Sequence, residues 1–130
     1  MPFVNVKVVK SQINEEIKAG IIKGLTDLIV NVMGREQSLT TIVIDEIEPS
    51  SWAINGAAIN TDKDFVSFVN IKVSKGTTNP EEMSTMIKKI KDLMSRVIGN
   101  QAVANYVVID ELNSAGWGFD GLSMYDRAKL

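Results

Sequence analysis

Pro2 has the most distinctive chemistry in this sequence because it directly follows the initiator methionine. An N-terminal proline presents a secondary amine on a ring that fixes its direction, and such an amine is both a nucleophile and a base. Burial among apolar side chains and nearby cations lowers the pKa of such an amine toward neutrality. This chemistry requires removal of Met1, since a retained Met1 makes the Pro2 nitrogen an amide. Alternatively, Pro2 simply begins an edge strand.

Two residue types that often carry catalysis are missing from the sequence. The 130 residues include no histidine and no cysteine, which excludes a Ser-His pair, a thiolate nucleophile and imidazole metal ligands. A catalytic base must therefore be a carboxylate, a lysine, a tyrosine or an amino terminus. The sequence has no obvious metal cluster, and we expect neither a metal nor another cofactor.

An internal repeat organises the chain. The segment PFVNVKV at residues 2–8 returns as SFVNIKV at residues 67–73, an offset of 65 from Asn5 to Asn70 (70 minus 5). The same offset aligns, without a gap, Gly34 with Gly99, Asp45-Glu46 with Asp110-Glu111, and Trp52 with Trp117. Agreement of this extent indicates a tandem duplication. We expect a single domain of two repeats, at residues 1–62 and 67–130.

The counterpart of Pro2 in the second repeat is Ser67, which lies inside the chain. Its nitrogen belongs to an ordinary peptide bond, whose lone pair is delocalised, so it cannot act as a base. Its hydroxyl has no histidine to activate it. We therefore expect one reactive amine per chain.

Each repeat shows the pattern of a strand, a helix and a second strand. In the first repeat, alternation over residues 2–9 predicts a strand, and apolar residues spaced three and four apart over residues 17–32 predict a helix. A β-branched run at residues 40–47 predicts the next strand. Gly20 and Gly24 indicate that this helix packs closely against the sheet. The stretch after Trp52 fits either a short hairpin or a loop.

Helix ends and strand ends carry further signals. Asn14 and Asn79 are predicted N-caps, and Gly34 is predicted to end the first helix. The acid pairs Asp45-Glu46 and Asp110-Glu111 could suggest acid-base chemistry. Adjacent strand residues point to opposite faces, however, so we interpret these acids as solvated strand ends.

These elements predict an α+β fold, in which two β-α-β units form a four-stranded sheet with both helices on one face. We expect the other face to remain apolar, with Val4, Val6, Val8, Ile42 and Ile44 available for contact with other chains. Three chains can enclose such faces in a barrel-like centre, which predicts a homotrimer.

Composition limits the partners and the location. The net charge is −2 and the basic residues are interleaved with acids, so we expect no nucleic-acid partner. No apolar run approaches the roughly 20 residues of a membrane span, and the first residues lack the layout of a signal peptide. We therefore expect a cytoplasmic protein that acts on a small molecule and not at a membrane.

Three groups of residues together resemble the 4-oxalocrotonate tautomerase family. They are Pro2 with the strand that follows it, the segment VIDE at residues 43–46, and Trp52 with Gly56. The resemblance covers nearly the whole chain, twice, and the length is similar to tandem members in which three fused chains replace a hexamer. It implies a fold like that of macrophage migration inhibitory factor. It also implies that Pro2 is the general base of a keto-enol isomerase, moving a proton by a 1,3- or 1,5-shift on a small 2-oxo or enol acid.

The arginines of the diacid-converting members are replaced in this sequence. One family arginine follows the first strand and another begins the second long strand. The residues at those places here are Gln12 and Thr41 in the first repeat, and Thr77 and Tyr106 in the second. These departures also fit an alternative function, a non-catalytic, trimeric binding or structural protein of tautomerase-like fold.

Other residues are candidates for holding the substrate. Trp52 and Trp117 match the aromatic pocket residue of the family, although either could instead pack a corner on the core. Cations that could hold an anion, or could simply be solvated, are Lys10, Lys75, Arg96 and Arg127. The predicted substrate site comprises Trp52, Trp117, Lys10, Gln12, Tyr106 and Arg127.

Overall fold

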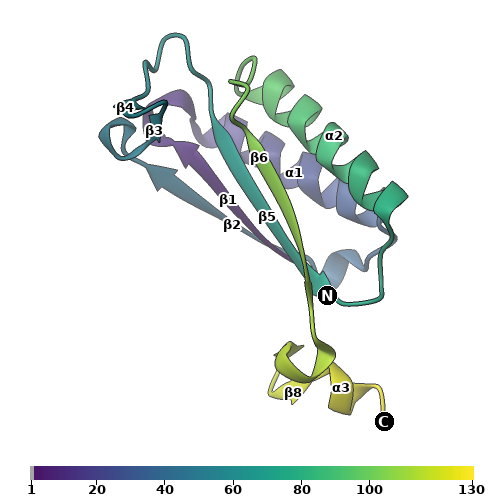
Figure 1. Cartoon of the computed structure of the whole chain (residues 1–130). Coiled ribbons are helices and arrows are strands. Elements are labelled where there is room, and N and C mark those ends of the chain that lie inside the picture. The colour runs from purple at the N-terminus through teal and green to yellow at the C-terminus, as the bar shows by residue number, and fades with distance from the viewer. Residues whose placement is uncertain (1) are drawn as a thin grey trace.

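Two β-α-β units form the body of the molecule (Figure 1). The computed structural model describes residues 2–130, so the question of Met1 retention lies outside the described residues. The first unit consists of β1 (Phe3–Val9), α1 (Glu15–Asn31) and β2 (Thr41–Ile47). The second consists of β5 (Ser67–Ser74), α2 (Pro80–Val97) and β6 (Tyr106–Leu112).

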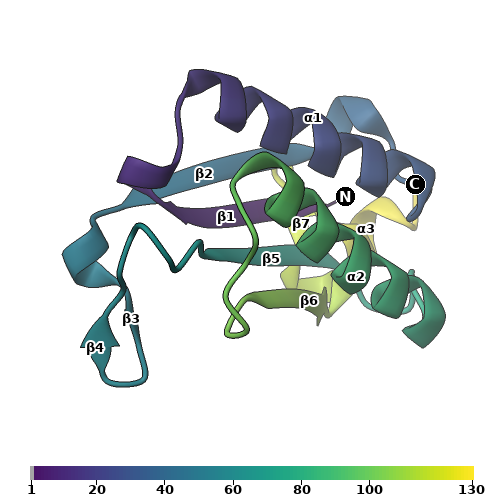
Figure 2. The same ribbon diagram turned by 90° about the horizontal axis from the view of Figure 1, so that it is seen from above.

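The four long strands form one mixed sheet in the order β2-β1-β5-β6. Strand β1 is parallel to β2 and β5 is parallel to β6, whereas the central pair β1 and β5 is antiparallel. Asn5 and Asn70 face each other at the middle of that pair, so a pseudo-twofold axis relates the two units. Both helices cover the same face of the sheet (Figures 1 and 2). The predicted fold class is therefore confirmed.

The core lies between the sheet and the two helices. Val4, Val6 and Val8 alternate onto this side of β1 and are fully buried. Their partners in the core include Val69, Ile71 and Val73 from β5, Ile21, Leu25 and Ile29 from α1, and Met86, Ile90 and Met94 from α2. The prediction that this apolar strand face stays open for other chains was wrong, because amphipathic helices need an apolar surface and take the only one that alternation provides.

The helix-free face of the sheet carries polar clusters at its centre. The carboxylate of Asp45 accepts hydrogen bonds from Asn5 Nδ2 and Lys7 Nζ, each at 3.0 Å. The equivalent cluster in the second repeat consists of Asn70, Lys72 and Asp110. The hydrogen bonds from the Asn and Lys side chains lower the pKa of Asp45 and of Asp110. These two acids are thus half-exposed members of cross-strand clusters, not the solvated strand ends that we expected.

Side-chain caps and a left-handed glycine set the ends of the helices. Asn14 Oδ1 accepts from the backbone N–H of Ile17 at 2.8 Å, and Asn79 Oδ1 accepts from that of Glu82 at the same distance. Gly34 has φ +64° and follows the end of α1, as the sequence predicted. Within residues 2–130, the structure has no helix that is long and apolar enough to span a membrane.

The two helices are in close contact at Gly24. A Cβ atom added there would lie 2.5 Å from Leu93 Cδ1, which is closer than van der Waals contact allows. We expected the glycines of α1 to permit contact with the sheet. The structure corrects that interpretation, because the missing side chain makes room for the neighbouring helix.

A short hairpin follows the last strand of each unit. The first hairpin pairs β3 (Ala53–Ile54) with β4 (Ala57–Ala58), and the second pairs β7 (Gly118–Phe119) with β8 (Leu122–Ser123). Their turns, Asn55-Gly56 and Asp120-Gly121, have positive φ at both residues, which is typical of tight hairpins. The second hairpin leads into α3 (Met124–Arg127).

The antiparallel centre of the sheet sends the two hairpins to opposite ends. Figure 1 shows β8 and α3 at the end where the chain begins, and β3 and β4 at the other end. Each hairpin therefore lies near the first residue of the other unit: the second hairpin near Pro2, and the first hairpin near Ser67.

Candidate active site

Pro2 is buried at the start of β1 and lines a pocket of about 270 Å³. Its carbonyl oxygen accepts a hydrogen bond from the backbone N–H of Thr41 at 3.3 Å, which ties the residue to the start of β2. The second unit supplies half of the lining through its hairpin and α3. The lining residues are Pro2, Glu36, Leu39, Phe119, Met124 and Arg127.

Arg127 is the cation of the Pro2 pocket. Its Nη2 donates to the carbonyl oxygen of Phe119 at 2.7 Å, and its Cζ lies 3.7 Å from the centroid of the Phe119 ring. Its Nε is buried without a hydrogen-bond partner. The ion pairs found within residues 2–130 do not include Arg127. The guanidinium is therefore oriented by Phe119 and retains a charge that can bind an anion.

Glu36 is the anion of the same pocket. It precedes a 3-10 turn (Gln37–Leu39), and its backbone carbonyl accepts from Thr40 Oγ1 at 2.9 Å. In the described part of the chain, its carboxylate takes part in no hydrogen bond or ion pair. The pocket thus combines a buried proline, apolar side chains, and one unpaired charge of each sign.

A second pocket, of about 310 Å³, lies around Ser67 at the other end of the sheet. Its lining residues are Trp52, Ala53, Ile54, Asn55, Ser67, Phe68, Ala104 and Tyr106, none of which is charged. The buried Ser67 hydroxyl donates to Gln101 Oε1 at 2.6 Å, and Gln101 Nε2 donates to the carbonyl oxygen of Gly99 at 3.1 Å. The Ser67 hydroxyl therefore already has a partner within the fold.

Two of the predicted substrate-binding residues have other partners at the surface or in the linker. Lys10 forms an exposed ion pair with Glu48 at 3.6 Å. Gln12 Nε2 donates to the carbonyl oxygens of Thr61 and Asp64, at 3.1 and 2.7 Å. Gln12 therefore holds the segment that joins the two repeats, and neither residue lines the Pro2 pocket.

The aromatic candidates are divided between the two ends of the sheet. Trp52 and Tyr106 line the Ser67 pocket. Trp117 lies beside the second hairpin, half-buried, and its indole N–H is buried without a partner. Of the six predicted substrate-binding residues, Arg127 is the one that lines the same pocket as Pro2.

Four residues of the Pro2 pocket were missed by the sequence analysis: Glu36, Leu39, Phe119 and Met124. The repeat offset relates two of them to the other pocket, since it aligns Phe119 with Ile54 and Leu39 with Ala104, which line the Ser67 pocket. The antiparallel joining of the repeats, which brings Phe119 to Pro2, leaves no pattern in the sequence.

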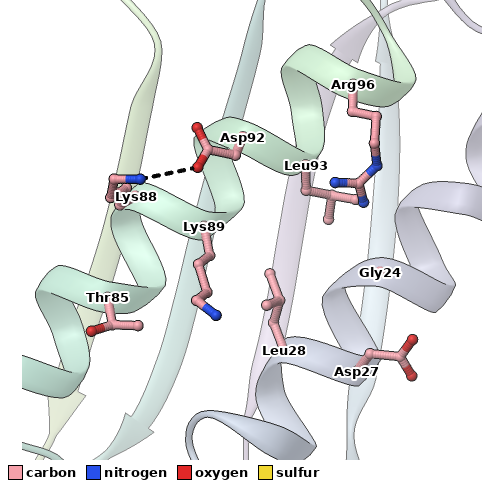
Figure 3. A pocket seen from close by; sticks show the side chains of 9 residues that line it. All are labelled: Gly24, Asp27, Leu28, Thr85, Lys88, Lys89, Asp92, Leu93 and Arg96. Carbon is pink, nitrogen blue, oxygen red and sulfur yellow. Dashed lines mark hydrogen bonds and ion pairs between the residues drawn. The ribbon is translucent and has the colours of Figure 1, made fainter.

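A larger groove of about 490 Å³ lies between α1 and α2 (Figure 3). Gly24, Leu28 and Leu93 give it an apolar floor, and Lys88 pairs with Asp92 on its rim at 3.4 Å. It shares no lining residue with either of the pockets at the ends of the sheet. In residues 2–130, no group of three potential ligand side chains is arranged to hold a metal ion.

Comparison with known proteins identifies relatives that are about one repeat long. Probable tautomerase K2 of Dickeya dadantii (strain 3937) is 37% identical over 59 residues, covering 45% of this chain and 88% of the relative. A probable tautomerase of Helicobacter pylori (strain J99) is 32% identical over 63 residues, covering 46% of this chain and 91% of the relative.

Solved structures of fused proteins match the whole chain. A native fused 4-OT aligns with a TM-score of 0.85 at 16% identity, covering 97% of this chain and 98% of that chain. A fused 4-OT described as a symmetric trimer aligns with a TM-score of 0.82 at 18% identity, covering 95% and 96%. The model of the family described as tautomerase enzyme matches residues 2–61 and again residues 68–127. The chain therefore belongs to the tautomerase family and consists of two tautomerase units fused in tandem.

Proposed function

We propose that the chain is an isomerase in which the Pro2 amine, freed by removal of Met1, is the general base of a keto-enol shift on a small 2-oxo or enol acid. The observation that carries this proposal is the pocket itself. Pro2 is buried beside the apolar side chains of Leu39, Phe119 and Met124 and shares the pocket with the unpaired Arg127. An apolar pocket with one cation suits a small organic anion.

The reaction needs one base and no external reagent. Arg127 holds the carboxylate of the enol acid. The Pro2 nitrogen takes the proton of the enol hydroxyl while the C2 carbonyl forms, and the resulting ammonium returns the proton to C3. In a conjugated dienol the proton goes to C5 instead. The amine ends in its starting form, so protons and electrons balance.

The surroundings of Pro2 act on its charge in opposite directions. Apolar walls and the Arg127 guanidinium disfavour the protonated amine, and the Glu36 carboxylate favours it. A base that must both accept and return a proton works best when its pKa lies near the pH at which the enzyme operates.

We further propose that three chains associate. One of the fused 4-OT structures that match nearly the whole chain is described as a symmetric trimer. The helix-free sheet face, with half-exposed Val43 on β2 beside Asn5, is available for such contacts. Light scattering should give three times the chain mass at micromolar concentration. The mass of a monomer would contradict a trimer.

Paired substitutions at the two repeat-equivalent positions test the catalytic proposal. Pro2→Ala should lower kcat/KM for the enol of an aryl pyruvate about 10²- to 10⁴-fold, the usual contribution of a general base. Ser67→Ala, its control, should change kcat/KM less than threefold, although loss of the bond to Gln101 can lower the thermal midpoint. Equal activity in Pro2→Ala and the native protein would remove proline from the mechanism.

The intact mass of the purified protein tests the first requirement of this proposal. Loss of Met1 frees the amine that the reaction requires. Retention of Met1 leaves Pro2 an amide, and then the non-catalytic binding or structural function is the one supported.

A further inference from the structure

The two charged residues of the Pro2 pocket have no charged equivalents in the pocket around Ser67. With the offset of 65, Glu36 corresponds to Gln101 (36 plus 65) and Arg127 corresponds to Asp62 (127 minus 65). Gln101 is neutral, and Asp62 does not line the Ser67 pocket. Charge of both signs thus distinguishes the pocket that contains the proline.

The second repeat shows how a side chain at this position reaches the first residue of its unit. Gln101 lies in the segment that precedes β6, and its side chain contacts the Ser67 hydroxyl at 2.6 Å. Glu36 lies in the segment that precedes β2 and lines the pocket of Pro2. Gln101 is buried whereas Glu36 is exposed, but the two side chains have the same length. Because Glu36 lines the Pro2 pocket, its carboxylate is long enough to reach the substrate space from the solvent side.

The position of these charges restricts what the pocket can hold. One guanidinium can bind one carboxylate in a bidentate manner. Arg127 is the cation among the six lining residues, and Glu36 is the anion. A second carboxylate on the same small molecule would have to approach Glu36. The repulsion between the two negative charges weakens binding of such a diacid.

We propose that Glu36 determines substrate specificity by excluding dicarboxylates, so that the pocket selects monocarboxylic 2-oxo or enol acids held by Arg127. The far end of the preferred acid is apolar, or it carries a hydrogen-bond donor that Glu36 can accept. Leu39 and Met124 provide apolar contacts for the intervening carbons. This inference rests on the proposed function, because it takes the Pro2 pocket as the substrate site.

Turnover of two enols of equal chain length tests the selection. The substrates are the enols of 2-oxohexanoate and 2-oxohexanedioate, compared in the native protein, in Glu36→Gln and in Glu48→Gln. Glu36→Gln removes the charge in the pocket, whereas Glu48→Gln removes an equal charge at an exposed site that pairs with Lys10. We expect the diacid-to-monoacid ratio of kcat/KM to rise at least roughly tenfold in Glu36→Gln, mainly through KM, and to change less than twofold in Glu48→Gln.

A ratio that changes less than twofold in Glu36→Gln would overturn the specificity role. Loss of monoacid turnover with an unchanged ratio would also overturn it, and would instead indicate that Glu36 acts on the Pro2 amine. Folding is not expected to interfere, because Glu36 is exposed and its carboxylate has no partner within residues 2–130. The thermal midpoint of each variant checks this.

Binding of non-reacting acids separates this inference from the catalytic proposal. Calorimetry with hexanoate and hexanedioate requires no turnover. We expect Glu36→Gln to tighten hexanedioate roughly tenfold and hexanoate less than twofold, and Arg127→Gln to weaken both. Unchanged affinities in Glu36→Gln would overturn the inference even if Pro2→Ala abolishes activity. If Pro2→Ala leaves turnover intact while Glu36→Gln still tightens hexanedioate, catalysis by proline is contradicted, but the role of Glu36 in excluding dicarboxylates is supported.

Discussion

The two ends of the sheet have the same backbone plan and different chemistry. At one end, Pro2 lies buried beside the hairpin of the second unit and shares its pocket with Arg127 and Glu36. At the other end, Ser67 lies beside the hairpin of the first unit, with its hydroxyl bonded to Gln101. Duplication has thus copied the positions of side chains, while the proline and the charged lining residues occur in the pocket at one end.

Neither repeat alone supplies the whole lining of the Pro2 pocket. Because β1 and β5 are antiparallel, the hairpin of each unit runs to the first residue of the other unit. Phe119 and Arg127 belong to the second repeat, yet they line the pocket of the proline from the first. A catalytic role for the first repeat therefore depends on residues of the second.

The largest expected effect on turnover comes from giving Pro2 an amide nitrogen like that of Ser67. A variant with extra residues before Pro2 that block processing converts the proline nitrogen into an amide, as at Ser67. Turnover of an aryl pyruvate enol should fall at least about 10²-fold while the fold is retained. Circular dichroism checks the fold. Turnover equal to that of the processed protein would mean that the two ends do not differ through the amine.

A smaller effect on kcat/KM is expected when the equivalent hairpin residues Phe119 and Ile54 are truncated to alanine. Phe119→Ala removes the ring on which Arg127 stacks, so kcat/KM should fall roughly ten- to a hundredfold. Ile54→Ala changes the equivalent residue at the Ser67 end and should leave kcat/KM within about threefold. Steady-state kinetics of the two variants make the comparison. A larger loss in Ile54→Ala than in Phe119→Ala would contradict the crossed arrangement of hairpins.

A third prediction concerns stability. Helix α1 carries Gly20 and Gly24, whereas α2 has Thr85 and Lys89 at the equivalent positions. Gly24→Ala places a methyl group against Leu93 and should lower the free energy of unfolding by about 1–3 kcal/mol. Gly20→Ala is the control, because its Cβ would lie 3.6 Å from Val97 Cγ1, in ordinary contact. It should raise the free energy of unfolding by about 0.5–1 kcal/mol through helix propensity. Urea denaturation measures both, and a stabilised Gly24→Ala would contradict the close helix contact.

The smallest expected effect concerns a feature that the repeats share. The folded-state pKa of Asp45 and of Asp110 is lowered, first by the Asn side chain and then by the Lys. A lowered pKa contributes stability above the ordinary value of 3.8, and this contribution is lost as the pH falls through the folded pKa. Asp45→Asn and Asp110→Asn should therefore lower the thermal midpoint by similar small amounts at pH 7 and less at pH 3.

Thermal scans at the two pH values test this shared feature. The size of the effect is limited by solvent screening, because both carboxylates are half-exposed. A strong effect in one repeat and none in the other would show that the clusters differ despite their matching geometry.

Most of the fold could be predicted because its signals are local and repeated. Apolar periods of two and of three to four residues indicated the strands and helices, and Asn14 and Asn79 indicated where the helices begin. The stretch after Trp52 fitted either a hairpin or a loop, and the turn residues Asn55-Gly56, like Asp120-Gly121 in the second repeat, favour the hairpin that forms. The covered face of the sheet was misjudged, although the alternation already placed the apolar side chains of β1 on one face, which the apolar sides of the helices must cover.

The candidate site was less predictable because it is assembled across the repeats. Arg127 was among the predicted residues, but nothing in the sequence separated it from Lys10, which pairs with Glu48 at the surface. Gln12 occupies the place of a family arginine and yet holds the linker. Glu36 went unnoticed, because its approach to Pro2 depends on how the segment before β2 folds back.

Covalent labelling tests most directly the claim that one reactive amine exists per chain. A carbonyl-bearing electrophile that traps amines of lowered pKa is added to the purified protein, and intact mass and peptide mapping locate the adduct. We expect one label per chain, on Pro2, only in molecules that have lost Met1, with activity lost in proportion. Labelling at a lysine such as Lys10, or full activity in protein that retains Met1, would contradict proline catalysis.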